Sequence, residues 1–308
     1  MVENRDWFDD AGQPLEKAKG DVRLAALTAD LTLTLLALEC ESMLVAGIRE
    51  RAVFEALGRA ESPPFADLGA EEDLDWTALA EQQPSHVLYH PGRNPPKVRE
   101  GIARIGARPV AIGPRHPNDN LSAFESLGWL LSRTEAADLL IRRLEAEIAR
   151  ARIMRLRRAA ITSVYLARAE PLCTVATDSY PAQMLDLAGF AAHPQAGGNA
   201  PPDAIGDAAR RPVWLQPLDH RPFAAHQIAV VLCSRRGGFR RAELPALARR
   251  FGLAEERVRL LDPDWPERDG VLAIEGLAEL TALHARLDTR DPLLGGGPRL
   301  PGPDTAEG

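Results

Sequence analysis

The sequence predicts an α/β protein of two lobes, and three observations support this fold class. The chain has 308 residues, about the length of two domains of ordinary size. Hydrophobic residues make up 45% of it, enough for a sizeable core. Segments typical of strands alternate with segments typical of helices, both before and after an uninterrupted helical segment in mid-chain. Such alternation predicts parallel sheets, because each helix carries the chain back to the start of the next strand.

The first half of the chain contains four apolar runs bounded by turn residues. These runs predict strands at 23–28, 43–47, 86–89 and 107–112. Helices are expected from near Asp30, at 75–83 and at 95–106. We expect Asp30 to be the N-cap of its helix, since a carboxylate at that position accepts hydrogen bonds from the free N–H groups of the first turn. Residues 7–15 contain the turn signal D-D-A-G-Q-P-L.

The middle of the chain predicts one long helix. Ser132 followed by Glu135 has the spacing of a capping box. Apolar residues then recur every four positions, at Leu140, Leu144 and Ile148. No Gly or Pro interrupts residues 132–158. On this evidence alone, the segment is either a long surface helix or a connection between two lobes.

The strand and helix pattern restarts after this helix. Strands are expected at 160–166, 228–233 and 257–261. A helix should begin near Pro181 and end at Gly189, a residue suited to a helix C-terminus. Residues 194–211 show no regular pattern, and residues 287–308, which contain G-G-G-P-R-L-P-G-P, are expected to be a disordered tail.

Charge and motifs exclude several classes of function. The net charge is −7, whereas a general nucleic-acid binder needs a dominant basic face. The sequence has no G-x-S-x-G, G-x-x-x-x-G-K or early G-x-G-x-x-G motif, so we expect no enzyme activity. Its three cysteines are far apart and are interpreted as buried thiols.

The N-terminal residues bear on location. They read M-V-E-N-R-D-W-F-D-D, without the basic and apolar regions of a secretory signal. No run approaches 18 apolar residues, so no insertion into a membrane is expected. We therefore expect a cytoplasmic protein. The alternative is an exported protein whose signal peptide has been removed.

Arginine and other polar residues follow most of the predicted strands. Ligands of parallel α/β sheets bind beyond the carboxyl ends of the strands, and arginine is suited to carboxylate or phosphate recognition. This pattern favours an anionic ligand; the alternative is a set of solvated loop arginines. Arg235 and Arg236 form the best pair, and Trp265 is a candidate stacking surface for a flat ligand. The strand-end candidates for ligand binding are Tyr89, His90, Arg115, Arg168, Arg235, Arg236 and Trp265, with Arg93, His116 and Arg268 nearby.

The histidines do not predict a dedicated metal site. His86 and His90 are four residues apart, but they bracket a predicted strand and would lie about 13 Å apart. A zinc site needs three or four converging ligands. His90 and His116 could converge from neighbouring strand ends, and a single His or Tyr could bind a metal already held by a macrocycle. Whether protein residues ligate a metal stays open.

Several blocks of the chain, taken in order, resemble one family. Residues 23–47 begin with a strand and the helix start A-D-L-T-L, in which Thr32 is kept and Leu33 replaces an acidic residue. The later blocks are S-Y-P-A-Q-M-L-D-L-A-G-F, V-V-L-C-S-R-R-G-G-F-R and L-L-D-P-D-W-P-E-R. Together they resemble the class III binding proteins, or helical-backbone metal receptors, which serve ABC importers of cobalamin, haem and ferric siderophores.

This resemblance implies two small α/β lobes with parallel sheets, joined by a single long backbone helix, and a ligand cleft between the lobes. It adds Tyr180, at the start of a helix facing the cleft, to the candidate ligand-binding residues. It implies non-catalytic binding of a corrinoid, haem or ferric chelate. The alternative is a cytosolic accessory protein, enzyme or interaction module with a degenerate cleft. The implied segments are an N-terminal extension (1–20), a first lobe (21–131), the linking helix (132–158), a second lobe (159–286) and a tail (287–308).

The surface that meets an importer departs from the family pattern. Family members carry an exposed glutamate on each lobe, which pairs with arginine on the permease. Thr77 takes the first position and His220 lies near the second, with Asp75 and Asp219 close by. We therefore expect no docking on an importer through that glutamate pair.

Overall fold

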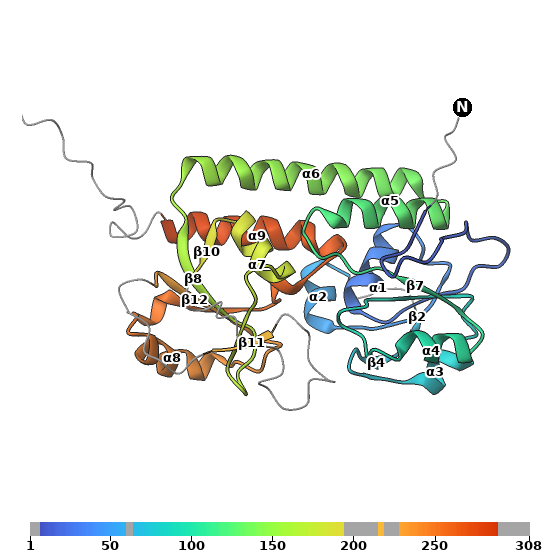
Figure 1. Cartoon of the computed structure of the whole chain (residues 1–308), viewed down its shortest axis with the longest axis horizontal. Helices are drawn as coiled ribbons and strands as arrows, with labels where there is room; N and C mark the ends of the chain where they lie inside the picture. Colours follow the sequence, from blue (N-terminus) through green and yellow to red (C-terminus); the bar gives the residue numbers. More distant parts are fainter. Residues whose placement is uncertain (1–6, 60–63, 194–214, 219–227, 289–308) are drawn as a thin grey trace, which may run out of the picture.

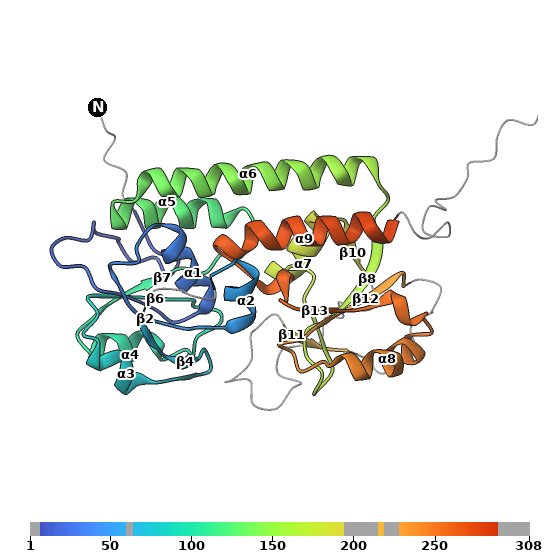
Figure 2. The same cartoon turned by 180° about the vertical axis from the view of Figure 1, so that it is seen from behind.

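The computed structural model describes residues 7–59, 64–193, 215–218 and 228–288. Two α/β lobes lie side by side beneath one long helix (Figures 1 and 2). This arrangement confirms the predicted fold class. None of the described helices is long and apolar enough to span a membrane.

The first lobe is built on a parallel sheet with the strand order β3-β2-β1-β6-β7. Its strands are β1 (Leu24–Ala26), β2 (Leu44–Gly47), β3 (Ala66–Asp67), β6 (His86–Tyr89) and β7 (Arg108–Ala111). Its helices are α1 (Ala29–Ala37), α2 (Arg51–Ala56), α3 (Trp76–Glu81), α4 (Val98–Arg104) and α5 (Asp119–Leu131). Two short antiparallel strands, β4 (Gly69–Ala70) and β5 (Asp73–Leu74), precede α3. The four strands predicted for this half are confirmed as β1, β2, β6 and β7, whose apolar residues are mostly buried in the sheet.

The second lobe has a parallel sheet with the strand order β10-β8-β12-β13. These strands are β8 (Ile161–Leu166), β10 (Phe190–Ala192), β12 (Val230–Ser234) and β13 (Val258–Leu261). An antiparallel pair, β9 (Cys173–Val175) and β11 (Leu215–Pro217), lies beside them. The helices are α7 (Tyr180–Leu187), α8 (Leu244–Phe251) and α9 (Val271–Asp288), with short 3-10 turns at Arg241–Glu243, Glu255–Arg257 and Trp265–Glu267. Residues 194–211 lie outside the described residues, as does the tail beyond Asp288.

The predicted long helix is confirmed as α6 (Thr134–Arg157). Its 24 residues span about 36 Å. One end packs on α5 of the first lobe, and the other contacts α7 and α9. The buried stripe is made of Ala137, Leu140, Leu144, Ile148 and Ala151. The helix therefore connects the two lobes and packs on both.

Two predicted caps are wrong. Ser132 does not begin α6: it has φ 57° and ψ 42° and forms the left-handed C-cap of α5, while the N-cap of α6 is Arg133, without a side-chain cap. The helix after β1 is capped by Thr28, whose hydroxyl accepts from the N–H of Leu31 at 3.1 Å. Asp30 therefore lies inside the first turn, and its carboxylate is free to contact another part of the molecule.

Helix α9 also contacts both lobes. It starts against α1, where the N–H of Val271 donates to Oγ1 of Thr34 at 3.0 Å. Gly270 has φ +57°, and a Cβ at this position would collide with the Thr34 hydroxyl. The other end of α9 lies in the second lobe, where His284 packs edge-on against Phe190 with ring centroids 5.4 Å apart. The start of α9 thus fixes the preceding loop, residues 262–270, against the first lobe.

Candidate functional site

Charged side chains from both lobes meet where the carboxyl ends of the two parallel sheets face each other. We call this set the interlobe seam. The first lobe contributes residues from the start of α1, the end of β2, the β4–β5 turn and the end of β6. The second lobe contributes residues that follow β12 and β13. The members of the seam are Asp30, Glu50, Glu71, Glu72, His90 and Arg93 from the first lobe, and Arg236, Asp264, Glu267, Arg268 and Asp269 from the second.

Arg268 is the innermost member of the seam. Its side chain is fully buried, although it follows the last strand of the second lobe. Nη1 donates to Oδ1 of Asp30 at 3.1 Å and to Oε2 of Glu50 at 2.8 Å. Nη2 donates to the other oxygen of Glu50 and to Oδ2 of Asp264 at 3.3 Å. A planar guanidinium that binds both oxygens of one carboxylate is strongly oriented, so Arg268 fixes its loop to the first lobe.

Arg93 occupies the other side of Asp30. Its Nη1 donates to Oδ2 of Asp30 at 2.6 Å and lies 3.3 Å from Oδ2 of Asp269. Nε and Nη2 bind both oxygens of Glu71, at 3.1 Å and 2.8 Å. Asp30 is thus held between Arg93 and Arg268, one arginine from each lobe.

Arg236 forms the outer part of the seam. Its Nη2 donates to Glu71 at 2.9 Å and to Glu72 at 3.1 Å. The Arg236 side chain is 28% exposed and that of Glu72 is 71% exposed, whereas Glu71 is buried. The next residue, Gly237, packs so closely on the end of β8 that a Cβ would collide with the carbonyl oxygen of Ala167. The glycine therefore allows the loop after β12 to present Arg236 to the first lobe.

The seam contains more carboxyl groups than guanidinium groups, and the pKa values reflect this. Burial raises the pKa of Asp30, but the adjacent Arg93 and Arg268 outweigh it and hold that pKa well below its ordinary value. Burial, followed by the charge of Asp30, raises the pKa of Asp269 to about 7. Burial, followed by the charge of Asp264, likewise raises the pKa of Glu267 to about 7. Two carboxyl groups of the seam thus titrate near neutral pH.

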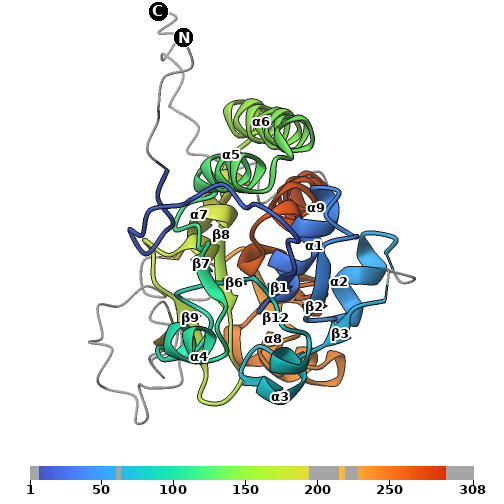
Figure 3. The same cartoon turned by 90° about the vertical axis from the view of Figure 1, so that its right-hand side faces the viewer.

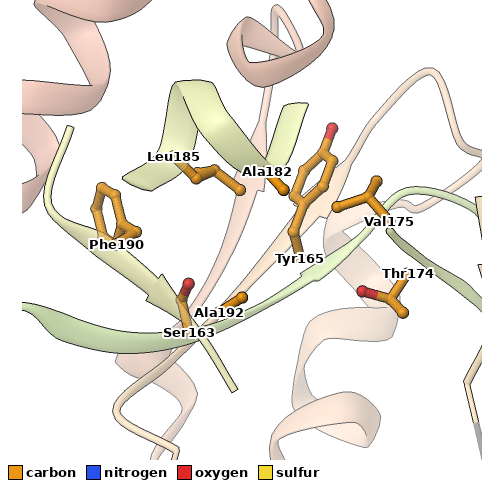
Figure 4. A pocket seen from close by; sticks show the side chains of 8 residues that line it. All are labelled: Ser163, Tyr165, Thr174, Val175, Ala182, Leu185, Phe190 and Ala192. Carbon is orange, nitrogen blue, oxygen red and sulfur yellow. The ribbon is translucent and has the colours of Figure 1, made fainter. Parts of the chain in front are cut away.

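A small cavity lies next to the seam inside the second lobe (Figure 4). Tyr165 lines this cavity, and its hydroxyl donates to Glu267 at 2.5 Å. The cavity measures about 20 Å³, which is room for one water molecule. The remaining lining residues are Ser163, Thr174, Val175, Ala182, Leu185, Phe190 and Ala192. A ligand of macrocycle size cannot occupy it.

Three of the candidates from the sequence lie at the seam. Arg236 binds carboxylates, as described above. His90 has Nε2 3.4 Å from Oδ2 of Asp269, and burial, followed by the charge of Arg93, lowers the pKa of this histidine to about 4. The hydroxyl of Tyr180 donates to the carbonyl of Arg268 at 2.9 Å and accepts from Nδ2 of Asn120 at 3.1 Å. Tyr180 therefore ties α7 to α5 and to the Arg268 loop.

The other five candidates lie outside the seam. Arg235 is exposed and pairs with Asp262 at 3.1 Å. Arg115 is exposed ahead of α5, and Arg168 is half-buried after β8. Tyr89 is buried in the core of the first lobe. Trp265 packs beside Gly276 of α9 and is half-buried.

The carboxylates that bind these arginines are not predicted by the sequence patterns. Asp30 was expected to cap its helix, and Glu50, Glu71, Asp264 and Asp269 were not among the predicted site residues. A signal was available for three of them: Glu50 follows the end of β2, and Asp264 and Asp269 follow the end of β13, so all three lie on the side of a sheet where arginines were expected. Among the described residues, no group of three or more His, Cys, Asp or Glu is placed to hold a metal ion.

The residues near the expected docking surface are only partly described. Thr77 is exposed on α3. Asp75 caps that helix, accepting from the N–H of Ala78 at 2.8 Å. Asp219 and His220 lie outside the described residues.

Comparison with known proteins gives a result for the fold only. No family model matches the sequence, and no curated protein matches it. Solved structures do match. The periplasmic vitamin B12 binding protein of Vibrio cholerae has 14% sequence identity and a TM-score of 0.66, covering 87% of this chain and 98% of its own.

Two heme-binding proteins match equally well. The periplasmic heme-binding protein of Roseiflexus sp. RS-1 has 20% identity and a TM-score of 0.67, covering 87% of this chain and 100% of its own. A periplasmic heme binding protein of Pseudomonas aeruginosa has 17% identity and a TM-score of 0.66, covering 85% and 91%. With its two parallel-sheet lobes joined by one long helix, the chain has the fold of the class III periplasmic binding proteins.

Proposed function

We propose that the protein binds a large, metal-containing or anionic ligand of the corrinoid, haem or ferric siderophore class, and that it catalyses no reaction. The observation that carries this proposal is the interlobe seam, where the strand ends of both parallel sheets meet. Ligands of parallel α/β sheets bind at that edge. The structural neighbours named above bind vitamin B12 or heme, which supports the same class of ligand here.

The ion pair between Arg236 and Glu72 is the outer pair of the seam, and it is the pair that a ligand can displace. Arg236 is bound by Glu72, which is 71% exposed, and an exposed ion pair contributes only about 0–1 kcal/mol. A carboxylate of the ligand can take the place of Glu72 on Arg236. The inner pair of Asp30 and Arg268 is fully buried, so we expect it to stay intact as the ligand binds.

Further candidates surround this outer pair on the second lobe. Arg235 and Arg168 follow the neighbouring strands β12 and β8, and Arg235 is 59% exposed. We propose these two with Arg236 as the main contacts for anionic groups, and His90 as the contact from the first lobe. Arg115, Tyr89, Tyr180 and Trp265 stay as secondary candidates.

The same comparison supports a proposal about location and partner. The neighbours are periplasmic proteins by name, which supports a periplasmic location for this one over the cytoplasmic location expected from its N-terminal residues. A periplasmic binding protein of this fold would deliver its ligand to an ABC importer. Since Thr77 replaces the family glutamate on the first lobe, docking would use other residues of that surface.

Titration of the purified protein with cyanocobalamin, haemin and a ferric catecholate siderophore tests the proposal. We expect one of the three to bind saturably with one ligand per chain, by calorimetry and by a change in its absorption spectrum. Replacing both Arg235 and Arg236 by Ala should weaken binding at least tenfold, because hydrogen bonds to charged groups contribute about 1.5–3 kcal/mol each. Arg249→Ala, at an exposed position on α8, is the matched control. Failure of all three ligands to bind at about 100 µM, or an unchanged affinity of the double variant, would contradict the proposal.

A further inference from the structure

Helix α6 carries large apolar side chains that are exposed to solvent. The described residues include four large apolar side chains that are exposed: Phe8, Leu139, Ile153 and Leu156. Three of the four lie on α6, where Leu139 is 53%, Ile153 50% and Leu156 88% exposed. A single exposed apolar residue is ordinary. Three on one helix form a common surface when their spacing matches the helical repeat.

These residues belong to a regular stripe. Positions 139, 142, 146, 149, 153 and 156 are separated alternately by three and four residues, and all six are exposed. This is the spacing of the a and d positions of a coiled coil. The stripe is separate from the buried stripe of α6, which packs on α5, α7 and α9. No described element lies on the outer side of α6 (Figures 1 and 3).

We propose that this stripe is a self-association surface, on which α6 of one chain packs antiparallel on α6 of a second copy. A two-fold axis near residues 147–148 places Leu139 of one copy opposite Leu156 of the other. The same axis places Arg142 opposite Ile153 and Ala146 opposite Ala149. The central alanines allow close approach of the helices, and the aliphatic stem of Arg142 can cover Ile153. A two-fold contact uses the same patch on both copies, so each of these pairs occurs twice.

Charge complementarity supports a second copy as the partner. Glu145 and Arg152 flank the stripe on the same side, and both are exposed. Neither forms an ion pair within the part of the chain that the structure describes. In the antiparallel register, Glu145 of each copy faces Arg152 of the other, which gives two ion pairs.

The opposite flank is compatible with the same register. There Arg143 of one copy approaches Arg150 of the other. Arg143 is already bound by Glu275 at 2.7 Å, and Arg150 lies 3.7 Å from Glu147, so much of their repulsion is compensated within each chain. A parallel pair is disfavoured, because it would place the uncompensated Arg142 side chains of the two copies opposite each other. One helix face buries less area than a standard interface, so we expect a reversible dimer of micromolar or weaker affinity.

Sedimentation velocity of the ligand-free protein between about 10 and 500 µM tests this proposal. The wild-type mass should rise from 33.5 kDa toward twice that value. Glu145→Arg and Arg152→Glu should each weaken association at least tenfold, since each places like charges opposite one another. A one-to-one mixture of the two variants should associate again, because both cross-pairs then have opposite charges. Glu256→Arg, at an exposed position of the second lobe, is the control for a change in net charge.

Cross-linking gives a second readout of the register. The described cysteines, Cys40, Cys173 and Cys233, are buried, so an introduced surface thiol can be oxidised selectively. A mixture of Leu139→Cys and Leu156→Cys proteins should form a disulfide-linked dimer, and neither variant alone should do so. A wild-type protein that stays monomeric to 500 µM would overturn the proposal. Association that Arg152→Glu leaves unchanged, or cross-linking of each cysteine variant with itself, would also overturn it. None of these outcomes depends on the ligand proposed above.

Discussion

The guanidinium of Arg268, from the loop after the last strand of the second lobe, donates to Oδ1 of Asp30 on the first helix of the first lobe at 3.1 Å. Both side chains are fully buried. Asp30 Oδ2 also accepts from the backbone N–H of Asp269 at 3.0 Å. One carboxylate therefore fixes both the side chain and the backbone of a loop 238 residues further along the chain. The two lobes are held together at this point as well as by α6.

Replacing Arg268 should be the most destabilising single change in the seam. Arg268→Met would leave Asp30, Glu50 and Asp264 without this partner, and breaking a buried ion pair costs about 3–5 kcal/mol. Urea denaturation at pH 7 measures the free energy of unfolding. Arg249→Met, on the exposed face of α8, is the control and should change it by less than about 0.5 kcal/mol. An equal change in the free energy of unfolding for the two substitutions would contradict a stabilising role for the buried ion pairs of Arg268.

Asp269 should make stability depend on pH in the neutral range. The pKa of this carboxyl group is raised from 3.8 to about 7 by burial and then by Asp30, despite the opposing charge of Arg93. Because the folded protein holds this proton more tightly, its favourable contribution is complete below about pH 4 and is lost as the pH rises through about 7. His90, whose pKa is lowered to about 4, acts in the opposite sense.

The variant Asp269→Asn removes this titration and keeps the shape of the side chain. Relative to wild type, its stability should improve as the pH is raised from 5 to 8, by up to about 3 kcal/mol, because this range covers about two units below the folded-state pKa. Denaturant titrations of both proteins at pH 5, 6, 7 and 8 measure this difference. Since His90 lies 3.4 Å from Asp269, the same comparison in a His90→Gln background removes the contribution of the histidine. A difference that does not change with pH would show that Asp269 is ionised throughout this range, and a change in the opposite direction would likewise contradict its raised pKa.

The two glutamates bound to Arg236 should behave differently. Glu72→Gln weakens an exposed pair and should change stability by less than about 1 kcal/mol. It should also increase the affinity for an anionic ligand several-fold, because Arg236 is then held less strongly by its own chain. Glu71→Gln should cost several kcal/mol, because Glu71 is buried and binds both Arg93 and Arg236. Calorimetric titration measures the ligand affinity of the two variants, and urea denaturation measures their stability. An equal loss of stability in both variants would contradict the distinction between a buried Glu71 and an exposed Glu72.

The loop that presents Arg236 should tolerate no side chain at Gly237. Gly237→Ala places a Cβ against the carbonyl of Ala167, and such a collision is relieved only by moving the loop, at a cost of about 1–3 kcal/mol. We expect lower stability and weaker ligand binding together. Gly238→Ala is the control for backbone strain, since Gly238 has φ +96° but its Cβ would have no contact closer than 3.7 Å. Thermal unfolding and ligand titration of both variants test this, and unchanged ligand affinity in Gly237→Ala would contradict it.

The fold was predictable because its signals are local. The strand at 86–89 is confirmed to the residue, and the long helix begins only two residues after its expected start. The errors at its start have a local cause too. A serine at position 132 is compatible both with the start of the next helix and with the end of the previous one. Only the backbone conformation distinguishes these two roles.

The interlobe seam was only half predictable. Arginines after strands β6, β12 and β13 were expected at one edge of each sheet, and the structure places Arg93, Arg236 and Arg268 there. Their partners were not predicted, because pairs such as Arg236 with Glu71 join residues 165 positions apart. No spacing rule connects residues at that separation. The same pairing changes the interpretation of the arginines, since three of them bind carboxylates of their own chain before any ligand arrives.

The central claim, that the protein is a ligand carrier, is tested most directly on the protein isolated from its own host. Native mass spectrometry, with an absorption spectrum of the same sample, measures whether a molecule is bound and whether it absorbs visible light. We expect an additional mass of one bound ligand per chain, and the absorption bands of a corrinoid, haem or ferric chelate. Protein that carries no added mass and takes up none of these ligands when they are supplied would contradict the account.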